Sequence, residues 1–524
     1  MKNIINKVGF ISMLLLIFMS SCKKDFLDKN PTDQLAAETF YSSKSSIDMA
    51  LTACYGSLKS CLFTWNMPAL DCLTDNAYST GNYYNATSLS QGPVNPTAGG
   101  YIDSVYLASY ANIARYNIFL QTLSAYNVAD LSAAIKIQYE AEVRLLRALK
   151  YFDLYKFYGS IPLVTVPLTL ATQYQPKVPA TDILAQINTD IDFAIANLPD
   201  IAYKNANGHL VKSSAQVLKA RVLLFDAYDA SGSAISSAMD QVKTVTSDII
   251  SKGYYSIAPS FRGLFCDDLG QQTGNPEFIY SVNYLAGIDV PIPFNIYGVA
   301  GNYLGTATSV WPLANFANEF EFVDGTPFSV SNPLYDATNV YKNRDPRMAK
   351  TIFTGTVTFE NGYTSNNMTQ TVTGYNYYKG VEGADAQNIY SNLNGSDWPL
   401  MRYAEVLLMY AEAANEVGGP DASVYSAVNQ IRNRADILMP PLPAGLSQIQ
   451  MRAAIRHERR IELAFEGFRY DDLKRWKIAE QVLNIPASES VVVRSFLPIN
   501  YHLPLPQIQI DINHGALIQN PDYK

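Results

Sequence analysis

The histidine and carboxylate side chains form no recognisable catalytic or metal-binding motif. His457 and Glu458 begin a match to the zinc motif H-E-x-x-H, but residue 461 is Ile, so the second histidine ligand is missing. The chain has only four His, and it contains no G-x-S-x-G nucleophile turn, phosphate-binding loop or G-x-G-x-x-G sequence. A glycosidase needs two carboxylates at a set separation, which a sequence alone does not show. We therefore expect no enzymatic activity, no catalytic residue, no metal site and no cofactor.

Two segments carry side chains suited to binding a sugar. Sugar rings have apolar faces that stack on aromatic rings, while their hydroxyls need amide or carboxylate partners on firmly held loops. The candidate ligand-binding residues are Asp75, Asn82, Tyr83 and Tyr84 in the first segment and Tyr297, Asn302, Tyr303 and Trp311 in the second. The competing interpretation of each aromatic residue is packing within its loop, and for Trp311, which precedes Pro312, a hydrophobic staple. Trp65 and Trp398 are predicted to belong to the core.

The overall composition favours a folded, Tyr-rich protein without a nucleic-acid partner. The 524 residues include 36 Tyr, 23 Phe and 4 Trp, and the apolar fraction of 48% supports a sizeable core. Charged residues make up 16%, against about 25% in typical domains. The formal net charge is −8, so the basic surface that nucleic acids require is missing. The tyrosines fit either a Tyr-rich helical core or an aromatic binding surface.

The first 22 residues are predicted to be a lipoprotein signal. Lys2 and Lys7 precede an apolar stretch over residues 8–19, which is too short to span a bilayer. Ser20 and Ser21 are small and are followed by Cys22, the expected lipidation site. Met19 stands where such signals usually have Leu, and plain secretion is the alternative. No later segment is long and apolar enough to cross a membrane, so we expect an anchored protein.

The remaining cysteines leave two possibilities open. They are Cys54, Cys61, Cys72 and Cys266, and no C-x-x-C pair occurs among them. One disulfide within the first three is possible, and reduced thiols in the core are the alternative.

Helical periodicity dominates both ends of the chain. Helices are predicted over residues 42–58, 103–124, 131–158, 181–197, 213–230, 237–251, 399–417, 424–434 and 447–466. Ser447 and Gln450 form a capping box for the last of these, and Gly467 follows it. Residues 62–100 and 253–395 are loop-rich, with a β-prone run at 351–359, and residues 503–517 look extended. Paired helices and the A-x3-F element of Ala148–Phe152 indicate stacked, tetratricopeptide-like hairpins.

Six stretches in order resemble the SusD/RagB family. The resemblance rests on residues 25–31 (DFLDKNP), 141–163 (AEVRLLRALKYFDLYKFYGSIPL), 343–347 (NRDPR), 399–413 (PLMRYAEVLLMYAEA), 456–467 (RHERRIELAFEG) and 469–476 (RYDDLKRW). They extend from just after Cys22 almost to the end of the chain. Lys23 and Lys24 depart from the family, whose surface-exported members commonly have acidic residues there.

The resemblance implies a mainly α, tetratricopeptide-like scaffold with a loop-rich, minor-β ligand-binding region. Its expected parts are the signal peptide (1–22), an N-terminal SusD-like helical region (23–250) and a C-terminal RagB/SusD region (251–524). It also implies an outer-membrane lipoprotein facing the cell exterior, which binds a glycan and acts as a lid on a SusC-like TonB-dependent transporter barrel. A peptide or other non-glycan nutrient and a structural surface role are the alternatives. The motif charges are expected to form ion pairs that lock helical hairpins together: Arg402, Glu405, Arg456, Glu458, Arg459, Glu462 and Glu466.

Overall fold

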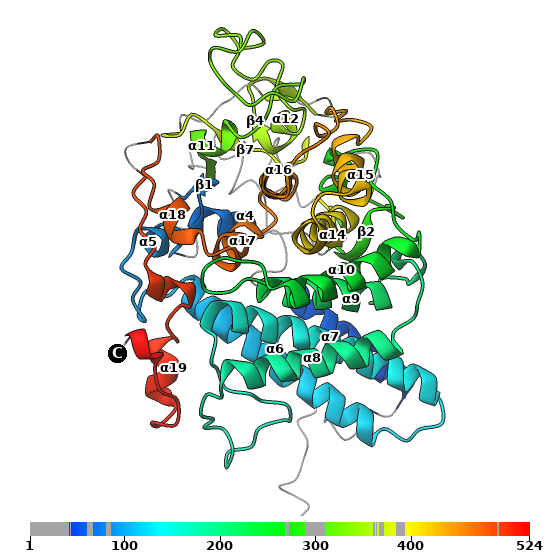
Figure 1. The fold of residues 1–524 in the computed structure, drawn as a ribbon. Helices are drawn as coiled ribbons and strands as arrows, with labels where there is room; N and C mark the ends of the chain where they lie inside the picture. The colour runs from blue at the N-terminus through cyan, green and yellow to red at the C-terminus, as the bar shows by residue number, and fades with distance from the viewer. Residues whose placement is uncertain are drawn as a thin grey trace, which may run out of the picture.

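The chain folds mainly into α-helices, with a few short strands (Figure 1). The computed structural model describes residues 41, 43–59, 67–79, 85–267, 272–288, 310–359, 362, 364–365, 371–383, 394–489 and 492–523. The N-terminal helices are α3 (Lys44–Tyr55), α4 (Met67–Leu70), α5 (Ala86–Gln91), α6 (Tyr101–Ala125), α7 (Ala133–Tyr158), α8 (Ala180–Asn197), α9 (Lys212–Phe225) and α10 (Ser236–Ser251). The C-terminal helices are α11 (Ala314–Ala317), α12 (Met348–Thr351), α14 (Tyr403–Gly418), α15 (Ala422–Arg432), α16 (Gln448–Glu462), α17 (Arg469–Arg475), α18 (Ala479–Leu483) and α19 (Gln507–Ile512).

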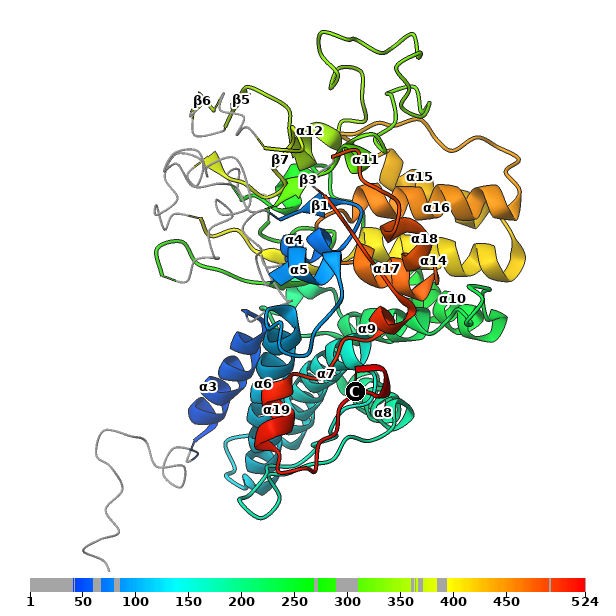
Figure 2. The same ribbon diagram turned by 90° about the vertical axis from the view of Figure 1, so that its left-hand side faces the viewer.

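The long helices pack against one another largely in chain order. Helix α6 contacts α7, α7 contacts α8, α8 contacts α9 and α9 contacts α10. The series continues through α14, which packs against α10, α15 and α16. Figure 2 shows α6, α7 and α8 at the lower end of the molecule and α14, α15 and α16 at the upper end, with α9 and α10 between them. The prediction of a mainly α scaffold is confirmed.

Helix α7 shows why the sequence pattern predicted these elements well. The Ser132 side chain accepts a hydrogen bond from the Ile135 amide and caps the first turn. Glu140 and Arg144 form the expected i,i+4 ion pair at 2.6 Å. From Ala141 onwards most side chains are buried, because α6, α8 and α9 all pack against this helix. Gly159, with φ of 70°, ends it.

Helix α16 begins as predicted but ends earlier. Ser447 and Gln450 form the capping box, yet the helix stops at Glu462 rather than 466. Phe465 and Gly467 take left-handed backbone conformations with φ of 62° and 81°, which a helix cannot contain. A Cβ at Gly467 would lie 2.6 Å from the Met67 Cε, so the close approach of this turn to α4 requires glycine.

Loss of the α16 cap should be measurable. We expect Ser447→Ala to lower the free energy of unfolding by about 1 kcal/mol, since the Ser447 hydroxyl then no longer satisfies the Gln450 amide. Urea denaturation followed by circular dichroism measures the change. Ser426→Ala, on the neighbouring helix α15, is the control; an equal loss in both variants would contradict the assignment.

Within the described residues the strands form four separate two-stranded antiparallel ladders. They pair β1 (Ala77–Tyr78) with β3 (Trp311–Pro312), β2 (Phe278–Val282) with β8 (Trp398–Arg402), β4 (Ile352–Phe353) with β7 (Asn376–Tyr377), and β5 (Val357–Thr358) with β6 (Thr364–Ser365). The β-prone run at 351–359 thus contains β4 and β5, as predicted.

Three local predictions are wrong. Residues 399–402 belong to β8, and α14 begins only at Tyr403; all five β8 residues are buried, so the strand lacks the alternation that would reveal it. The segment 503–517 is not wholly extended, since α19 begins directly after Pro506. The stretch 62–100 contains α4 and α5 as well as loops.

The described cysteines are not disulfide-bonded. Cys54, Cys72 and Cys266 are buried thiols, and burial raises the pKa of the Cys54 thiol to about 12. Cys61 and Cys22 lie outside the described residues. Within those residues no helix is both long and apolar enough to cross a bilayer.

Candidate functional site

A buried network of charged side chains joins the C-terminal helices to the strands. Glu462, fully buried at the end of α16, accepts hydrogen bonds from Arg402 Nη1 and Arg434 Nη2, both at 2.7 Å, and from Arg347 Nη1 at 3.1 Å. Burial alone would raise the pKa of Glu462, but the three guanidiniums hold it well below its usual range. These residues come from four distant parts of the chain, so the network fixes the tertiary arrangement.

The same network extends to both sides of Glu462. Glu277, at the start of β2, pairs with Arg402 and Arg434. Glu466 pairs with Arg402 and Lys379, whereas Glu458 pairs with Arg347 and Arg432. Because every one of these groups is buried, they are committed to holding the fold and present no surface to a ligand.

The predicted ion pairs of the motif residues are therefore found for all but one. Besides the residues above, Glu405 pairs with Arg221 at 2.7 Å and Arg459 with Asp472 at 2.7 Å. Arg456 differs from the prediction. Its guanidinium lies 4.5 Å from the centroid of the Trp476 ring, so it acts through a cation–π contact.

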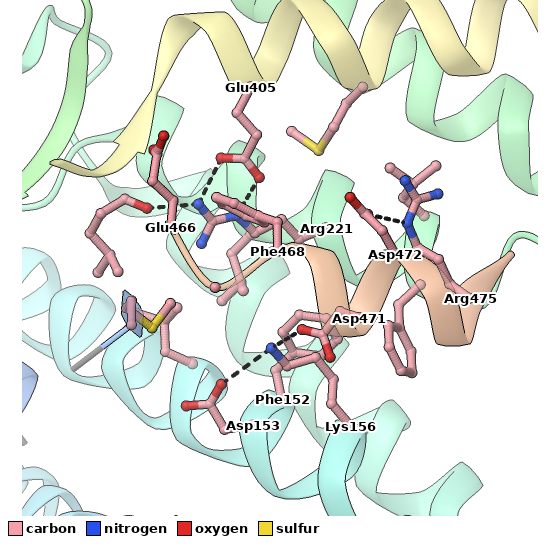
Figure 3. Close-up of a pocket in the computed structure, with 18 of the residues that line it drawn as sticks. Phe152, Asp153, Lys156, Arg221, Glu405, Glu466, Phe468, Asp471, Asp472 and Arg475 are labelled. Atoms are coloured by element: carbon pink, nitrogen blue, oxygen red, sulfur yellow. Dashed lines mark hydrogen bonds and ion pairs between the residues drawn. The ribbon is translucent and has the colours of Figure 1, made fainter. Parts of the chain in front are cut away.

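A small cavity of about 70 Å³ lies between α7, α9, α14 and α17 (Figure 3). Lys156 projects into it and pairs with Asp471 at 2.6 Å and Asp153 at 3.5 Å. Arg221 and Glu405 face each other across its upper side. The cavity has room for a few water molecules but not for a sugar ring. We interpret it as a space left inside the packing of α7 and α9 against α14 and α17.

Asp75, a predicted ligand residue, is buried just before β1. Its carboxylate lies 2.8 Å from Arg460 Nη2 and 2.9 Å from Arg469 Nη2. Burial would raise the pKa of Asp75, but the two arginines hold it far below its usual range. Asp75 therefore ties the segment before β1 to α16 and α17. Arg460 and Arg469 are not among the predicted site residues, although both lie in the motif stretches at 456–467 and 469–476.

Trp311, the other described member of the predicted set, is 5% exposed in β3. It pairs in register with Tyr78 of β1, and the two ring centroids are 6.2 Å apart. The neighbouring Leu313 amide donates to the Asn76 carbonyl at 2.9 Å. The remaining predicted residues lie outside the described part of the chain: Asn82, Tyr83, Tyr84, Tyr297, Asn302 and Tyr303.

The β1–β3 ladder pairs the described residues that border the two predicted segments in the chain. Tyr78 lies four residues before Asn82 in the chain, and Trp311 lies eight residues after Tyr303. The β1–β3 ladder, which we call the stem, thus joins the chain next to two predicted segments that lie more than 200 residues apart in sequence. Arg460 anchors the residues just before β1, because its Nε donates to Asn76 Oδ1 at 2.9 Å while its guanidinium pairs with Asp75.

Two family models together match most of the chain, apart from residues 225–275 between them. A model described as "SusD family" matches residues 276–523, and a model described as "Starch-binding associating with outer membrane" matches residues 25–224. The chain belongs to the SusD/RagB family.

Relatives of this SusD/RagB chain support the assignment along its full length. The SusD-like protein P2 of Formosa agariphila is 25% identical, and the alignment covers 99% of both chains. The crystal structure of a SusD-like carbohydrate-binding protein from Bacteroides fragilis is 26% identical, with a TM-score of 0.76 over 91% of this chain and 99% of that one. Surface glycan-binding protein A from Bacteroides thetaiotaomicron, in complex with laminarihexaose, shares the fold at 20% identity, with a TM-score of 0.69 over 91% of this chain and 100% of that one.

No metal centre is formed by the described residues of this SusD/RagB protein. None of their His, Cys, Asp and Glu side chains gather in groups of three or more that could hold an ion. His457 Nε2 lies 2.7 Å from the Glu319 carbonyl oxygen, so this histidine of the incomplete zinc motif hydrogen-bonds to the backbone.

Proposed function

We propose that this chain is a cell-surface lipoprotein that binds a glycan and delivers it to a SusC-like TonB-dependent barrel. The observation that carries the proposal is the shared stem of the two predicted ligand segments. Tyr83 and Tyr84 follow β1, while Tyr297 and Tyr303 precede β3, and the two strands pair with each other. The segments that carry these four tyrosines and the amides of Asn82 and Asn302 are therefore both connected to the stem.

The stem is anchored to the C-terminal helices α16 and α17. Asp75 and Asn76 are both bound by Arg460, which belongs to α16, and Asp75 is bound again by Arg469 of α17. A ligand that binds segments with a fixed base loses less free energy to ordering than one that binds a free loop. The rigid helical scaffold is therefore suited to support recognition by the segments that it carries.

The membrane part of the proposal rests on the N-terminal sequence. Cys22 is the proposed lipidation site, and the described structure begins at Tyr41 after a polar stretch that would act as a tether. The family model's description, which mentions association with the outer membrane, is in line with this location. We propose that the protein performs no chemistry on the glycan; the buried carboxylates Glu458, Glu462 and Asp75 are each paired with an arginine.

Native affinity electrophoresis tests the proposed function. The chain lacking residues 1–22 should be retarded by one polymer in a panel containing laminarin, starch, xyloglucan, galactomannan and pectin. We expect the double variant Tyr83→Ala/Tyr84→Ala to bind at least tenfold more weakly, equivalent to about 1.4 kcal/mol. Tyr174→Ala is the matched control, because Tyr174 is exposed and lies on the loop between α7 and α8.

Two results would count against glycan capture. If no polymer retards the chain, a peptide library should be screened next, because the same stem could serve a peptide-binding lid. If the tyrosine variants bind as well as the unchanged chain, the site lies elsewhere on the protein.

A further inference from the structure

A hollow of about 430 Å³ lies apart from the β1–β3 ladder, between α3, α7 and the turn before α9. It is lined by Asp48, Thr52 and Tyr55 of α3, Tyr139 of α7, and Asn207 and His209 of the turn. Its volume is several times that of the interior cavity at Lys156 and falls within the range of about 300–1,000 Å³ that small-molecule sites occupy. The sequence analysis singled out none of these residues.

The walls of the hollow are held by hydrogen bonds that begin at Glu142. Its fully buried carboxylate accepts from Tyr55 OH at 2.6 Å, from Gln138 Nε2 at 2.9 Å and from His209 Nδ1 at 2.9 Å. The hydrogen bond that His209 donates to Glu142 raises the pKa of His209. The His209 ring lies parallel to the Tyr139 ring, with centroids 6.4 Å apart and 5° between planes. The His209 side chain is still 39% exposed, so it offers a fixed aromatic surface.

Asp48 of α3 adds a further set of polar contacts along the hollow. Tyr139 OH donates to Asp48 Oδ1 at 2.7 Å, and Lys44 Nζ donates to Asp48 Oδ2 at 2.6 Å. Both interactions leave oxygen atoms of Asp48 and Tyr139 fixed along the hollow. A ligand that binds here would meet polar groups that are already in place, which lowers the entropy cost of binding.

The turn at Asn207 and Gly208 joins this hollow to a second one of about 200 Å³, because both residues line both spaces. The second hollow adds Tyr203, Asn283 and Asp397 to the lining. Asn207 and Gly208 have φ of 50° and 84°, and a Cβ on Gly208 would lie 4.0 Å from Asn283 Nδ2. The two hollows that share this turn are together called the groove.

The lining of the groove points to a neutral, hydroxyl-rich ligand. Lys44 is paired with Asp48 and His209 with Glu142, and Lys204 and Asp397 line the same hollow, so neither sign of charge is in excess. Amide and hydroxyl groups supply most of the remaining polar surface, as sugar hydroxyls require. We propose that this groove is a second glycan-binding site, separate from the predicted site at the β1–β3 ladder, for a short neutral stretch of oligosaccharide. Its ligand class rests on the proposed function.

The substitution Thr52→Trp tests the groove. Thr52 is exposed on α3 and lines the first hollow, so a tryptophan there fills the space without entering the core. Thr52→Ala is the matched control. The probe is the hexasaccharide of whichever panel polymer retards the chain, beginning with laminarihexaose. Isothermal titration should give two molecules per unchanged chain, one per Thr52→Trp chain and one per Tyr83→Ala/Tyr84→Ala chain.

Hydrogen exchange measured by mass spectrometry locates the second molecule. We expect the probe to protect the amides of residues 203–210 in the unchanged chain and in Tyr83→Ala/Tyr84→Ala, but not in Thr52→Trp. One molecule per chain that Thr52→Trp leaves in place, or protection that disappears in the tyrosine variant, would overturn the second site while the proposed function stands. Absence of binding by every panel polymer would overturn the proposed function and the ligand class together.

Discussion

Replacing Glu462 with glutamine should lower the free energy of unfolding by about 3–5 kcal/mol, the range expected when one partner of a buried ion pair is removed. Glutamine keeps the size of the side chain but removes the negative charge that Arg402, Arg434 and Arg347 share. The three guanidiniums are buried and would be left with excess positive charge in a region of low polarity. Guanidinium chloride denaturation followed by tryptophan fluorescence measures the loss.

A surface pair provides the comparison for this prediction. Asp192 lies 2.8 Å from Lys219, but its side chain is 61% exposed. Solvent screens such a pair, so Asp192→Asn should change the free energy of unfolding by less than about 1 kcal/mol. Equal effects of Glu462→Gln and Asp192→Asn would show that the buried network does not hold the C-terminal helices to the strands.

Acid should destabilise the protein through Glu412 as the pH falls from about 4.5 towards 2. This buried carboxylate on α14 accepts from Arg475 Nη2 at 2.7 Å, Trp476 Nε1 at 2.8 Å and Tyr228 OH at 2.6 Å. Burial alone would raise the pKa of Glu412, yet the neighbouring Arg475 outweighs it and lowers the pKa from 4.5 to about 2. The stabilisation from Glu412 is therefore complete above 4.5, the pKa of this group in the unfolded chain. It is lost as the pH falls towards about 2, the pKa of Glu412 in the folded protein.

The expected size of this loss is about 3 kcal/mol, from 1.36 kcal/mol for each pH unit between the two pKa values. The lowered pKa values of Asp75, Glu458 and Glu462 act in the same direction. Denaturation curves recorded from pH 6 to pH 2 test the prediction. In Glu412→Gln, stability at pH 6 should be lower and its decline between pH 4.5 and 2 shallower. Parallel curves for the two proteins would rule out Glu412 as a source of the acid sensitivity.

The sequence could predict most helices because their signals are local. Ser132 and Gly159 mark the ends of α7, and the capping box of Ser447 and Gln450 marks the start of α16. These signals lie within a few residues of the structure that they specify. Strand β8 has no such signal, since it is buried on both faces and begins with Trp398 and Pro399.

The partners of the charged residues could not be predicted in the same way. The motif stretches show that Arg402 and Glu462 need buried partners, but they do not show that Glu277 and Arg347 supply them from distant segments. The same holds for Asp75, whose arginine partners lie 385 and 394 residues away in the chain. His209 and Tyr139 are unremarkable in the sequence and form a groove wall only through tertiary packing.

The β1–β3 ladder consists of two residue pairs, which makes it a stem on which different binding segments could be exchanged. Its anchors, Asp75 and Asn76, contact helix α16 through Arg460. Doubling the length of a flexible connection costs only about 0.6 kcal/mol, so insertions beyond Tyr78 or before Trp311 would barely weaken the scaffold. Ligand preference in such a protein can therefore diverge rapidly during evolution while the helical body stays unchanged.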